Sequence, residues 1–340
     1  FAKVNAQIVG YGFLMTFVSS FGQTYFVGAF GPSIQTEFGL TNTSWGLIYM
    51  IGTLASAALL PWSGKQIDRL DLRLYTIIVI AVLAIACVTT ALVTGPVMLV
   101  LAIFLLRQSG QGLASHTGIT TMARYFDAER GRAIAIATLG FSVGQSFLPL
   151  LAVFSIGIFG WRLSYASVGI FSIIFLLPTV LWLLKDQEAR HARHVHGRAL
   201  SSSGSTHTNS WTRSRVLHDT RFWLIILGYF TPALILTAMF FHHLNLADAK
   251  GWSHAWVTGN YVLFAVSTAF TVMVSGHLVD RFRAVNLLPY MLIPLVFGLA
   301  LVSIIDTPWV VLPYMLLIGI NLGMVYTVTS AVWPELYGVK

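Results

Sequence analysis

Ten apolar runs, each long enough to cross a membrane as a helix, leave this chain few possible folds. They lie near residues 7–31, 43–66, 74–94, 97–123, 132–159, 162–184, 221–246, 254–279, 285–304 and 308–332. A helical crossing of the hydrocarbon core needs about 20 mainly apolar residues. Because lipid neither donates nor accepts hydrogen bonds, helices are the structures that satisfy their own backbone in such open crossings. The pattern predicts an all-α membrane protein.

The charged residues support this and exclude a soluble enzyme. They make up only 9% of the 340 residues, whereas soluble domains carry about 25%. If the N-terminus is cytoplasmic, every Lys and Arg except Arg107, Arg162 and Lys250 falls on the cytoplasmic side. Such a bias is typical of multi-pass proteins. The net charge of +8 therefore reflects topology, and we expect a protein of the plasma (inner) membrane that binds no nucleic acid.

One long polar segment divides the chain. Residues 185–220 are rich in His, Arg and Ser and have too little apolar area to order themselves. We therefore predict an N-terminal six-helix half at 1–184, a cytoplasmic polar linker at 185–220, and a C-terminal half with helices 7–10 at 221–340. The linker histidines are an alternative metal site, but the linker interpretation is favoured, and no metal or cofactor is predicted.

Two loops repeat the same pattern. Gly64-x-x-x-Asp68-Arg69 follows the second apolar run, and Gly276-x-x-x-Asp280-Arg281 follows the eighth. Both loops are predicted to be cytoplasmic. An internal repeat of helical halves joined by a linker is a known plan of transporters.

The first loop is similar to the signature loop between helices 2 and 3 of the major facilitator superfamily. Further matches are Arg107-x-x-Gly110-x-Gly112 and the stretches 124–132 and 333–338. The chain departs from the pattern at Asp71, where the family has glycine, and at Leu74, where a second base is usual. The resemblance implies two pseudo-symmetric six-helix halves, the second truncated here to four helices. It also implies a secondary transporter that works by alternating access.

The repeated loops are candidates for a cytoplasmic gating latch. Their carboxylates can lie against the positive N-terminal end of a helix, and their arginines can form charge-assisted hydrogen bonds. By pseudo-symmetry, Asp280 is expected to face residues 129–132 and Asp68 to face helix 11. The alternative is that these groups only anchor the loops. The predicted gating residues are Gly64, Asp68, Arg69, Arg73, Arg124, Gly276, Asp280 and Arg281.

A single cation lies deep within an apolar run. Counted from Pro96, Arg107 lies about 16 Å along its helix, close to the middle of the bilayer. All 12 acidic residues fall in loops or at helix ends, so Arg107 has no carboxylate at its depth. Arginine suits carboxylates through its planar fork, which favours a small organic anion such as a monocarboxylate. Backbone carbonyls, groups on helices outside this chain, and a structural or coupling role remain alternatives.

The resemblance also places helices 1, 4, 7 and 10 around a central cavity. The predicted substrate-binding side chains are therefore Arg107, Gln111, Gln23, Tyr25, Tyr229, Asn321 and Tyr326. His116 is a candidate for proton coupling, although nine residues at 100° each put it on the opposite face of the helix from Arg107. His242 and His243 are expected to be exposed at the outer end of helix 7. Uniport, exchange and proton symport stay open.

One motif points to an enzyme instead. Gly140-Phe-Ser142-Val-Gly144 matches the nucleophile elbow of hydrolases, which requires a strand before a helix. Here the motif lies inside an apolar run, so we interpret Gly140 and Gly144 as a helix-packing pair. The sequence thus favours a monomeric, non-enzymatic carrier whose partners are a small anion and the lipid bilayer, with a coupling proton as one of the open alternatives. The alternatives are a carrier of neutral or amphiphilic compounds with a structural Arg107, and an intramembrane hydrolase using Ser142.

Overall fold

The computed structural model describes residues 5–126, 130–185 and 213–337, which are helical with short connections and contain no strand. Eight helices in this part of the chain are long and apolar enough to cross a membrane. They are Asn42–Asp68, Leu72–Ala91, Pro96–Tyr125, Gly131–Leu183, Thr220–Phe241, His254–Val279, Ala284–Ile304 and Pro308–Tyr337. The all-α membrane fold is therefore confirmed.

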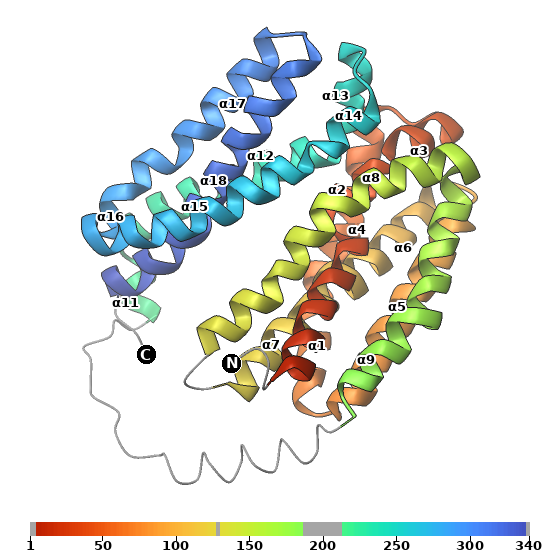
Figure 1. Ribbon diagram of the computed structural model, residues 1–340, viewed down its shortest axis with the longest axis horizontal. Helices are drawn as coiled ribbons and strands as arrows, with labels where there is room; N and C mark the ends of the chain where they lie inside the picture. Colours follow the sequence, from red (N-terminus) through yellow and green to blue (C-terminus); the bar gives the residue numbers. More distant parts are fainter. Residues whose placement is uncertain (1–4, 127–129, 186–212, 338–340) are drawn as a thin grey trace. The chain divides into compact units, whose positions relative to one another are not determined.

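The chain forms two compact units, residues 1–202 and 203–340, coloured red to green and cyan to blue in Figure 1. The division falls within the segment 185–220 that the sequence predicts as a linker. Most of that segment, 186–212, lies outside the described residues.

A glycine explains why two predicted crossings appear as one long helix. α8 (Arg130–Phe171) contains Gly160 at φ 74° and ψ 163°, a non-helical conformation that glycine adopts at little steric cost. The crossings predicted at 132–159 and 162–184 meet at this residue. The second continues through the π-helical turn η4 (Ser172–Leu176) and α9 (Leu177–Leu183).

The first predicted crossing is not one continuous helix, which corrects the expectation for residues 7–31. α1 (Ala6–Val18) passes into a 3₁₀ turn, η1 (Ser19–Gly22), and α2 (Thr24–Ala29) follows. Between them Gln23 is extended, with φ −79° and ψ 153°. The Ser19 hydroxyl donates to the carbonyl of Thr16 at 2.6 Å, and such local bonds compete with regular helix. A short outer helix, α3 (Gly31–Phe38), completes this region.

Helices 2 to 4 of the first unit follow the predicted order. They are α4 (Asn42–Gly64) with the turn η2 (Lys65–Asp68), α5 (Leu72–Ala91), and α6 (Pro96–Leu106) continued by η3 (Arg107–Ala114) and α7 (Ser115–Tyr125). Asp71 caps α5 by accepting hydrogen bonds from the backbone amides of Arg73 and Leu74, at 2.8 and 3.2 Å. This capping role accounts for an aspartate where the family has glycine.

The second unit contains α11 (Arg213–Leu217), α12 (Thr220–Phe241), α13 (His243–Lys250), α14 (His254–Gly259), α15 (Tyr261–Phe282), α16 (Ala284–Leu287), η5 (Leu288–Leu292), α17 (Ile293–Ile304), η6 (Pro308–Val310) and α18 (Val311–Tyr337). Its main packing is between α15 and α18. The buried amide of Asn321 on α18 donates to the carbonyl of Met291 at 2.6 Å and so fastens α18 to η5.

The expectation that His243 is exposed is wrong. Its side chain is 1% exposed, and its Nδ1 lies 2.9 Å from the hydroxyl of Tyr261. The two rings stack, and the ring of Tyr314 meets the imidazole edge-on. The cause is the chain turn at His242, which ends α12 and starts α13 at His243. His242 itself is half-buried.

Candidate functional site

The fourth helix of the first unit is π-helical where its polar residues lie. The segment η3 (Arg107–Ala114) joins α6 to α7. Its backbone hydrogen bonds link residues that are five apart in the sequence, whereas those of an α-helix link residues that are four apart. Each residue therefore advances less around the axis than in an α-helix. After eight such residues His116 reaches the same side as Arg107, and both line one cavity. The prediction that they occupy opposite faces is wrong for this reason.

Two glycines allow the broken first helix to touch this π-helical segment. A Cβ on Gly22 would lie 2.7 Å from the amide nitrogen of Gln111, and one on Gly110 would lie 2.7 Å from the nitrogen of Gly22. No side chain larger than hydrogen fits at either position. The direct backbone contact brings the end of η1 within reach of Arg107, three residues before Gly110.

Arg107 is buried and is held by neutral groups. Its Nη1 donates to the carbonyl of Gly22 at 3.1 Å and to the hydroxyl of Thr24 at 3.4 Å. The guanidinium carbon lies 5.2 Å from the centre of the Tyr49 ring, and only 6% of the side chain is exposed. The carbonyl at a helix end carries partial negative charge, which favours the cation. Within the described residues Arg107 forms no ion pair, and its Nε has no hydrogen-bond partner.

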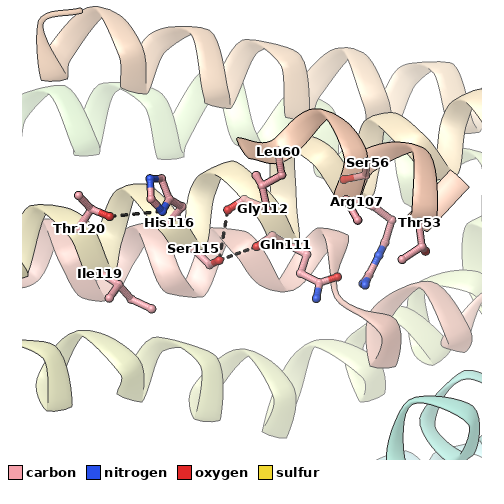
Figure 2. A pocket seen from close by; sticks show the side chains of 11 residues that line it. Thr53, Ser56, Leu60, Arg107, Gln111, Gly112, Ser115, His116, Ile119 and Thr120 are labelled. Carbon is pink, nitrogen blue, oxygen red and sulfur yellow. Dashed lines mark hydrogen bonds between the residues drawn. The ribbon is translucent and has the colours of Figure 1, made fainter. Parts of the chain in front are cut away.

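A cavity of about 430 Å³ opens beside Arg107. This volume is in the range of small-molecule sites. Figure 2 shows Arg107 and His116 toward opposite ends of the group, with Gln111 and Ser115 between them. The half-buried amide of Gln111 forms no hydrogen bond with another side chain of the described residues. The residues that line the cavity are Thr53, Ser56, Ala57, Leu60, Arg107, Gln111, Gly112, Ser115, His116, Ile119 and Thr120.

A buried amide that sequence reasoning missed fixes one wall of this cavity. Gln108 accepts a hydrogen bond from Ser56 at 2.9 Å and donates to Ser63 at 2.6 Å. These two bonds fasten η3 to α4, and such polar links between helices are common in membranes. The signal that could have revealed it is an amide directly after Arg107 in an otherwise apolar run.

A second cavity, of about 380 Å³, leads from the first toward the loop motif. The two cavities share Ala57, Leu60 and His116. The second is also lined by Pro61, Gly64, Lys65 and Asp68. His116 therefore stands at the junction between the Arg107 cavity and the predicted cytoplasmic loop.

Within that loop, Asp68 forms an ion pair with Arg124, at the end of α7. Arg124 also donates to the carbonyl of Ile67 at 3.2 Å. Asp68 thus has a partner in its own unit, whereas the sequence had suggested helix 11. Arg69 and Arg73 are exposed.

The second copy of the loop has a similar pair with the charges exchanged. Arg283, which ends α15 at a left-handed φ of 65°, contacts Glu335 on α18 at 2.8 Å. The second carboxylate oxygen of Glu335 accepts a hydrogen bond from the amide of Ala284 at 2.9 Å. In each unit, an ion pair therefore joins the loop to the last turn of a later helix, α7 in the first unit and α18 in the second. Sequence reasoning missed both Arg283 and Glu335.

The other predicted gating groups are less constrained. Nothing lies within 4 Å of a Cβ built on Gly276, and the guanidinium carbon of Arg281 lies 5.4 Å from the centre of the Phe282 ring. The side chain of Asp280 and residues 127–129 lie outside the described part of the chain. The contact expected between them therefore stays a prediction.

The remaining substrate candidates do not line the Arg107 cavity. Gln23 is half-buried at the helix break, and buried Tyr25 donates to the hydroxyl of Ser20 at 2.8 Å. Tyr229, Asn321 and Tyr326 belong to the second unit. The structure thus brings Arg107, Gln111 and His116 together.

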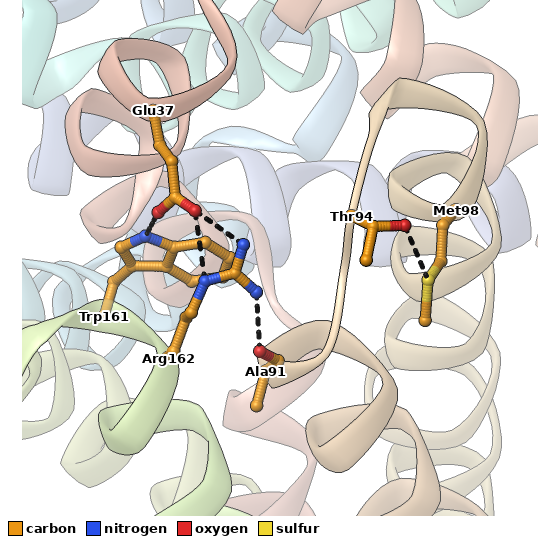
Figure 3. Close-up of polar contacts among 6 residues, drawn as sticks. All are labelled: Glu37, Ala91, Thr94, Met98, Trp161 and Arg162. Atoms are coloured by element: carbon orange, nitrogen blue, oxygen red, sulfur yellow. Dashed lines mark hydrogen bonds and ion pairs between the residues drawn. The ribbon is translucent and has the colours of Figure 1, made fainter.

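An ionic cluster lies at the end of the first unit that is opposite the Asp68 loop and is predicted to face outward (Figure 3). Glu37 on α3 accepts hydrogen bonds from Trp161 at 2.6 Å and from Arg162 at 2.6 and 3.1 Å. Arg162 also donates to the carbonyl of Ala91, at the end of α5, at 2.7 Å. The hydrogen bonds from Arg162 and Trp161 lower the pKa of the Glu37 carboxyl. The cluster joins α3, α5 and the turn at Gly160.

The described residues contain neither a hydrolase elbow nor a metal cluster. Ser142 lies within the helical run of α8 and not after a strand. A Cβ on Gly140 would collide with the carbonyl of Phe13 and with Thr16 on α1, which confirms the helix-packing interpretation. No group of three or more His, Cys, Asp or Glu side chains in the described ranges is placed to hold a metal ion.

Comparison with known proteins supports the architecture. The chain is 22% identical over 265 residues to the uncharacterized transporter YybO of Bacillus subtilis (strain 168), which covers 74% of this chain and 60% of that protein. It is 25% identical over 209 residues to the probable sulfoacetate transporter SauU of Cupriavidus necator, covering 61% and 48%. It is 24% identical over 197 residues to a gallate transporter of Pseudomonas putida, covering 58% and 42%. The chain therefore spans about half the length of these relatives.

Solved structures show the same fold at low sequence identity. The nucleoside transporter NupG superposes with a TM-score of 0.69 and 14% identity, covering 98% of this chain and 82% of that one. A bacterial homologue of the human lysosomal transporter Spinster, inward-facing and unoccupied, has a TM-score of 0.66 and 16% identity, covering 96% and 75%.

The family model described as Major Facilitator Superfamily matches residues 12–339. This range includes the repeated loops, the π-helical segment with Arg107 and both units. The family and the names of the curated relatives point to a transporter and not to an enzyme. With the match running over nearly its whole length, the chain belongs to the Major Facilitator Superfamily.

Proposed function

We propose that the protein is a secondary active transporter that moves a small organic anion, such as a monocarboxylate, by alternating access. The observation that carries the proposal is Arg107. It is a buried cation on the wall of a cavity of about 430 Å³, with a free Nε and no carboxylate partner in the described structure. A cation in this position favours an anionic guest because the guest supplies the missing counter-charge.

The named relatives are consistent with an anionic substrate. One is a gallate transporter and another a probable sulfoacetate transporter, and gallate and sulfoacetate are both carboxylates. The structural neighbours support the fold alone. The Lys and Arg distribution supports a cytoplasmic N-terminus in the plasma (inner) membrane, and we propose that the transporter acts as a monomer.

In this proposal, the cytoplasmic loops act as latches during the transport cycle. Asp68 with Arg124, and Arg283 with Glu335, tie each loop to a helix end. Such surface pairs are individually weak, about 0.2–1 kcal/mol, so they can be exchanged without a large barrier. The extended backbone at Gln23 is a point where the first helix can bend.

Uptake of labelled carboxylates into proteoliposomes tests the role of Arg107. Removing one partner of a buried charge pair costs about 2–5 kcal/mol, so Arg107→Ala should lower kcat/KM at least about 30-fold. Arg107→Lys should give an intermediate value because it keeps the charge but loses the planar fork. Arg221→Ala, which removes an exposed arginine, is the matched control. Normal anion uptake by both Arg107 variants would refute the proposal.

The second candidate is a carrier of neutral or amphiphilic compounds in which Arg107 is structural. Its bonds to Gly22 and Thr24 and its position over the Tyr49 ring favour this role. The two candidates predict different effects of a bound carboxylate on the thermal midpoint of the protein. An anion site predicts that carboxylates raise the thermal midpoint of the wild-type protein and not that of Arg107→Ala. A structural Arg107 predicts a lower midpoint in the variant and no protection of either protein.

A further inference from the structure

The imidazole of His116 has an open edge toward both cavities. Its Nδ1 lies 3.4 Å from the hydroxyl of Thr120, and its Nε2 has no hydrogen bond to another described residue. A Cβ built on Gly64 would lie 3.6 Å from Nε2, so the missing side chain of this glycine leaves the ring edge uncovered. His116 is half-buried and lines both cavities.

The space between Arg107 and His116 is largely apolar along one side. Ala57 and Leu60 line the cavity here, and the hydroxyl of Ser115 is turned to the backbone, donating to the carbonyl of Gln111 at 2.5 Å. Figure 2 shows Arg107 and His116 on either side of Leu60, Gln111 and Ser115. The site therefore has a cation at one end and an imidazole at the other, with an apolar side chain and the amide of Gln111 between them.

The other charged side chains of the two cavities are engaged or exposed. Asp68 is paired with Arg124, and Lys65 is exposed on the loop. A guest held by Arg107 and extending toward the loop therefore passes the amide of Gln111 and reaches the ring of His116. Either ring nitrogen of a neutral imidazole can serve as the hydrogen-bonding atom, as donor or acceptor according to tautomer.

We infer that His116 binds a second polar group of the anion whose carboxylate Arg107 holds. The inference rests on the proposed function and narrows its substrate class. The preferred substrates are small acids with a hydrogen-bonding group beyond a short apolar spacer, and plain apolar acids bind more weakly. His116 is thus a specificity residue, and Arg107 is the contact common to all substrates.

Equilibrium binding of benzoate and 4-hydroxybenzoate to the purified protein tests this inference. The two acids share the carboxylate and the ring and differ in one hydroxyl. One net hydrogen bond predicts that the wild-type protein prefers 4-hydroxybenzoate about fivefold or more. His116→Phe should abolish the preference, so that the variant binds the two acids with equal affinity. His116→Gln, which can still form a hydrogen bond, should retain part of it.

Two further variants make the test specific. Thr120→Val removes the partner of Nδ1 and should reduce the preference by less than His116→Phe. His254→Ala removes a histidine bound to Asp248 in the second unit and should change neither affinity.

The possible results separate this inference from the proposed function. Wild-type protein that binds benzoate without preferring the hydroxylated acid would overturn the inference and leave anion transport standing. An equal loss of affinity for both acids in His116→Phe would also overturn it, because that result indicates a structural role of His116. Wild-type protein that binds neither acid nor other carboxylates would refute both proposals.

Discussion

Glu37 concentrates several interactions in a single carboxylate. It accepts hydrogen bonds from Trp161 and Arg162, and Arg162 continues to the carbonyl of Ala91. The guanidinium carbon of Arg162 also lies 4.4 Å from the centre of the Trp161 ring. About two fifths of the Glu37 side chain is exposed, 41%, so solvent screens the pair. The contribution of Glu37 to the free energy of unfolding is therefore modest but sensitive to pH.

We predict that Glu37 stabilises the first unit at neutral pH and not in acid. Its pKa is lowered in the folded state by Arg162 and Trp161. The stabilisation is therefore present above the ordinary glutamate value of about 4.3 and is lost as pH falls through the lowered pKa. At pH 7, Glu37→Gln should lower the free energy of unfolding by about 0.2–1 kcal/mol. The change should be seen as a lower thermal midpoint of the variant in detergent. The difference from wild type should shrink as the pH is lowered through the acidic range; a difference that stays constant there would contradict the ionic explanation.

At the scale of helices, α1 and α8 are joined through a glycine. A Cβ on Gly140 would collide with the carbonyl of Phe13 and with Thr16, and Thr16 donates to the carbonyl of Ala137. We predict that Gly140→Ala lowers the thermal midpoint, since overpacking costs about 1–3 kcal/mol. Gly157→Ala is the matched control in the same helix, because nothing lies within 4 Å of its added Cβ. Equal midpoints for the two variants would rule out close packing at Gly140.

Sequence periodicity predicted which segments are helical but not how two of them depart from regular helix. The run at 7–31 is long enough for one continuous helix, yet the contact of Gly22 with Gly110 coincides with a break at Gln23. In η3 the π-helical turn changes the face of every later residue. That turn accounts for the error on His116. Both departures arise where helices meet, and a pattern read along one helix does not contain that information.

At the scale of the whole molecule, the latch pairs lead to a prediction about access. Asp68→Asn removes the charge that pairs with Arg124 and should loosen the loop beside the second cavity. A cysteine introduced at exposed Lys65 should then react several-fold faster with a polar maleimide. The reaction is selective because the single native cysteine, Cys87, is buried.

A neighbouring carboxylate provides the control for this experiment. Asp71→Asn also removes a negative charge from the loop but keeps the cap of α5, because asparagine caps helices as well as aspartate. It should leave the labelling rate unchanged. If Asp68→Asn labels no faster than Asp71→Asn, the loop is an anchor and not a latch.

The repeated loop motif at Gly64 and Gly276 predicts two related halves, because the repetition can be seen in the sequence itself. The depth of Arg107 followed from helix rise alone. The hydrogen-bond partners of Arg107 could not be predicted in this way, because the carbonyl of Gly22 is a backbone group that every residue carries. The burial of His243 was missed for a related reason: a chain turn at one residue reverses the exposure of the next.

The exchanged charges at the two loops bear on how the halves of this protein should be compared. In the first half the loop supplies the acid, Asp68, and the helix end the base, Arg124; in the second the loop supplies the base, Arg283, and the helix end the acid, Glu335. The two pairs do not use equivalent positions: when the repeats are aligned on Gly64 and Gly276, Asp68 lies opposite Asp280 and Arg283 lies opposite Asp71. The attraction between the two elements is nevertheless the same. After a duplication, the same joint between a loop and a helix end can therefore be formed by different positions of the repeat and with the opposite arrangement of charges.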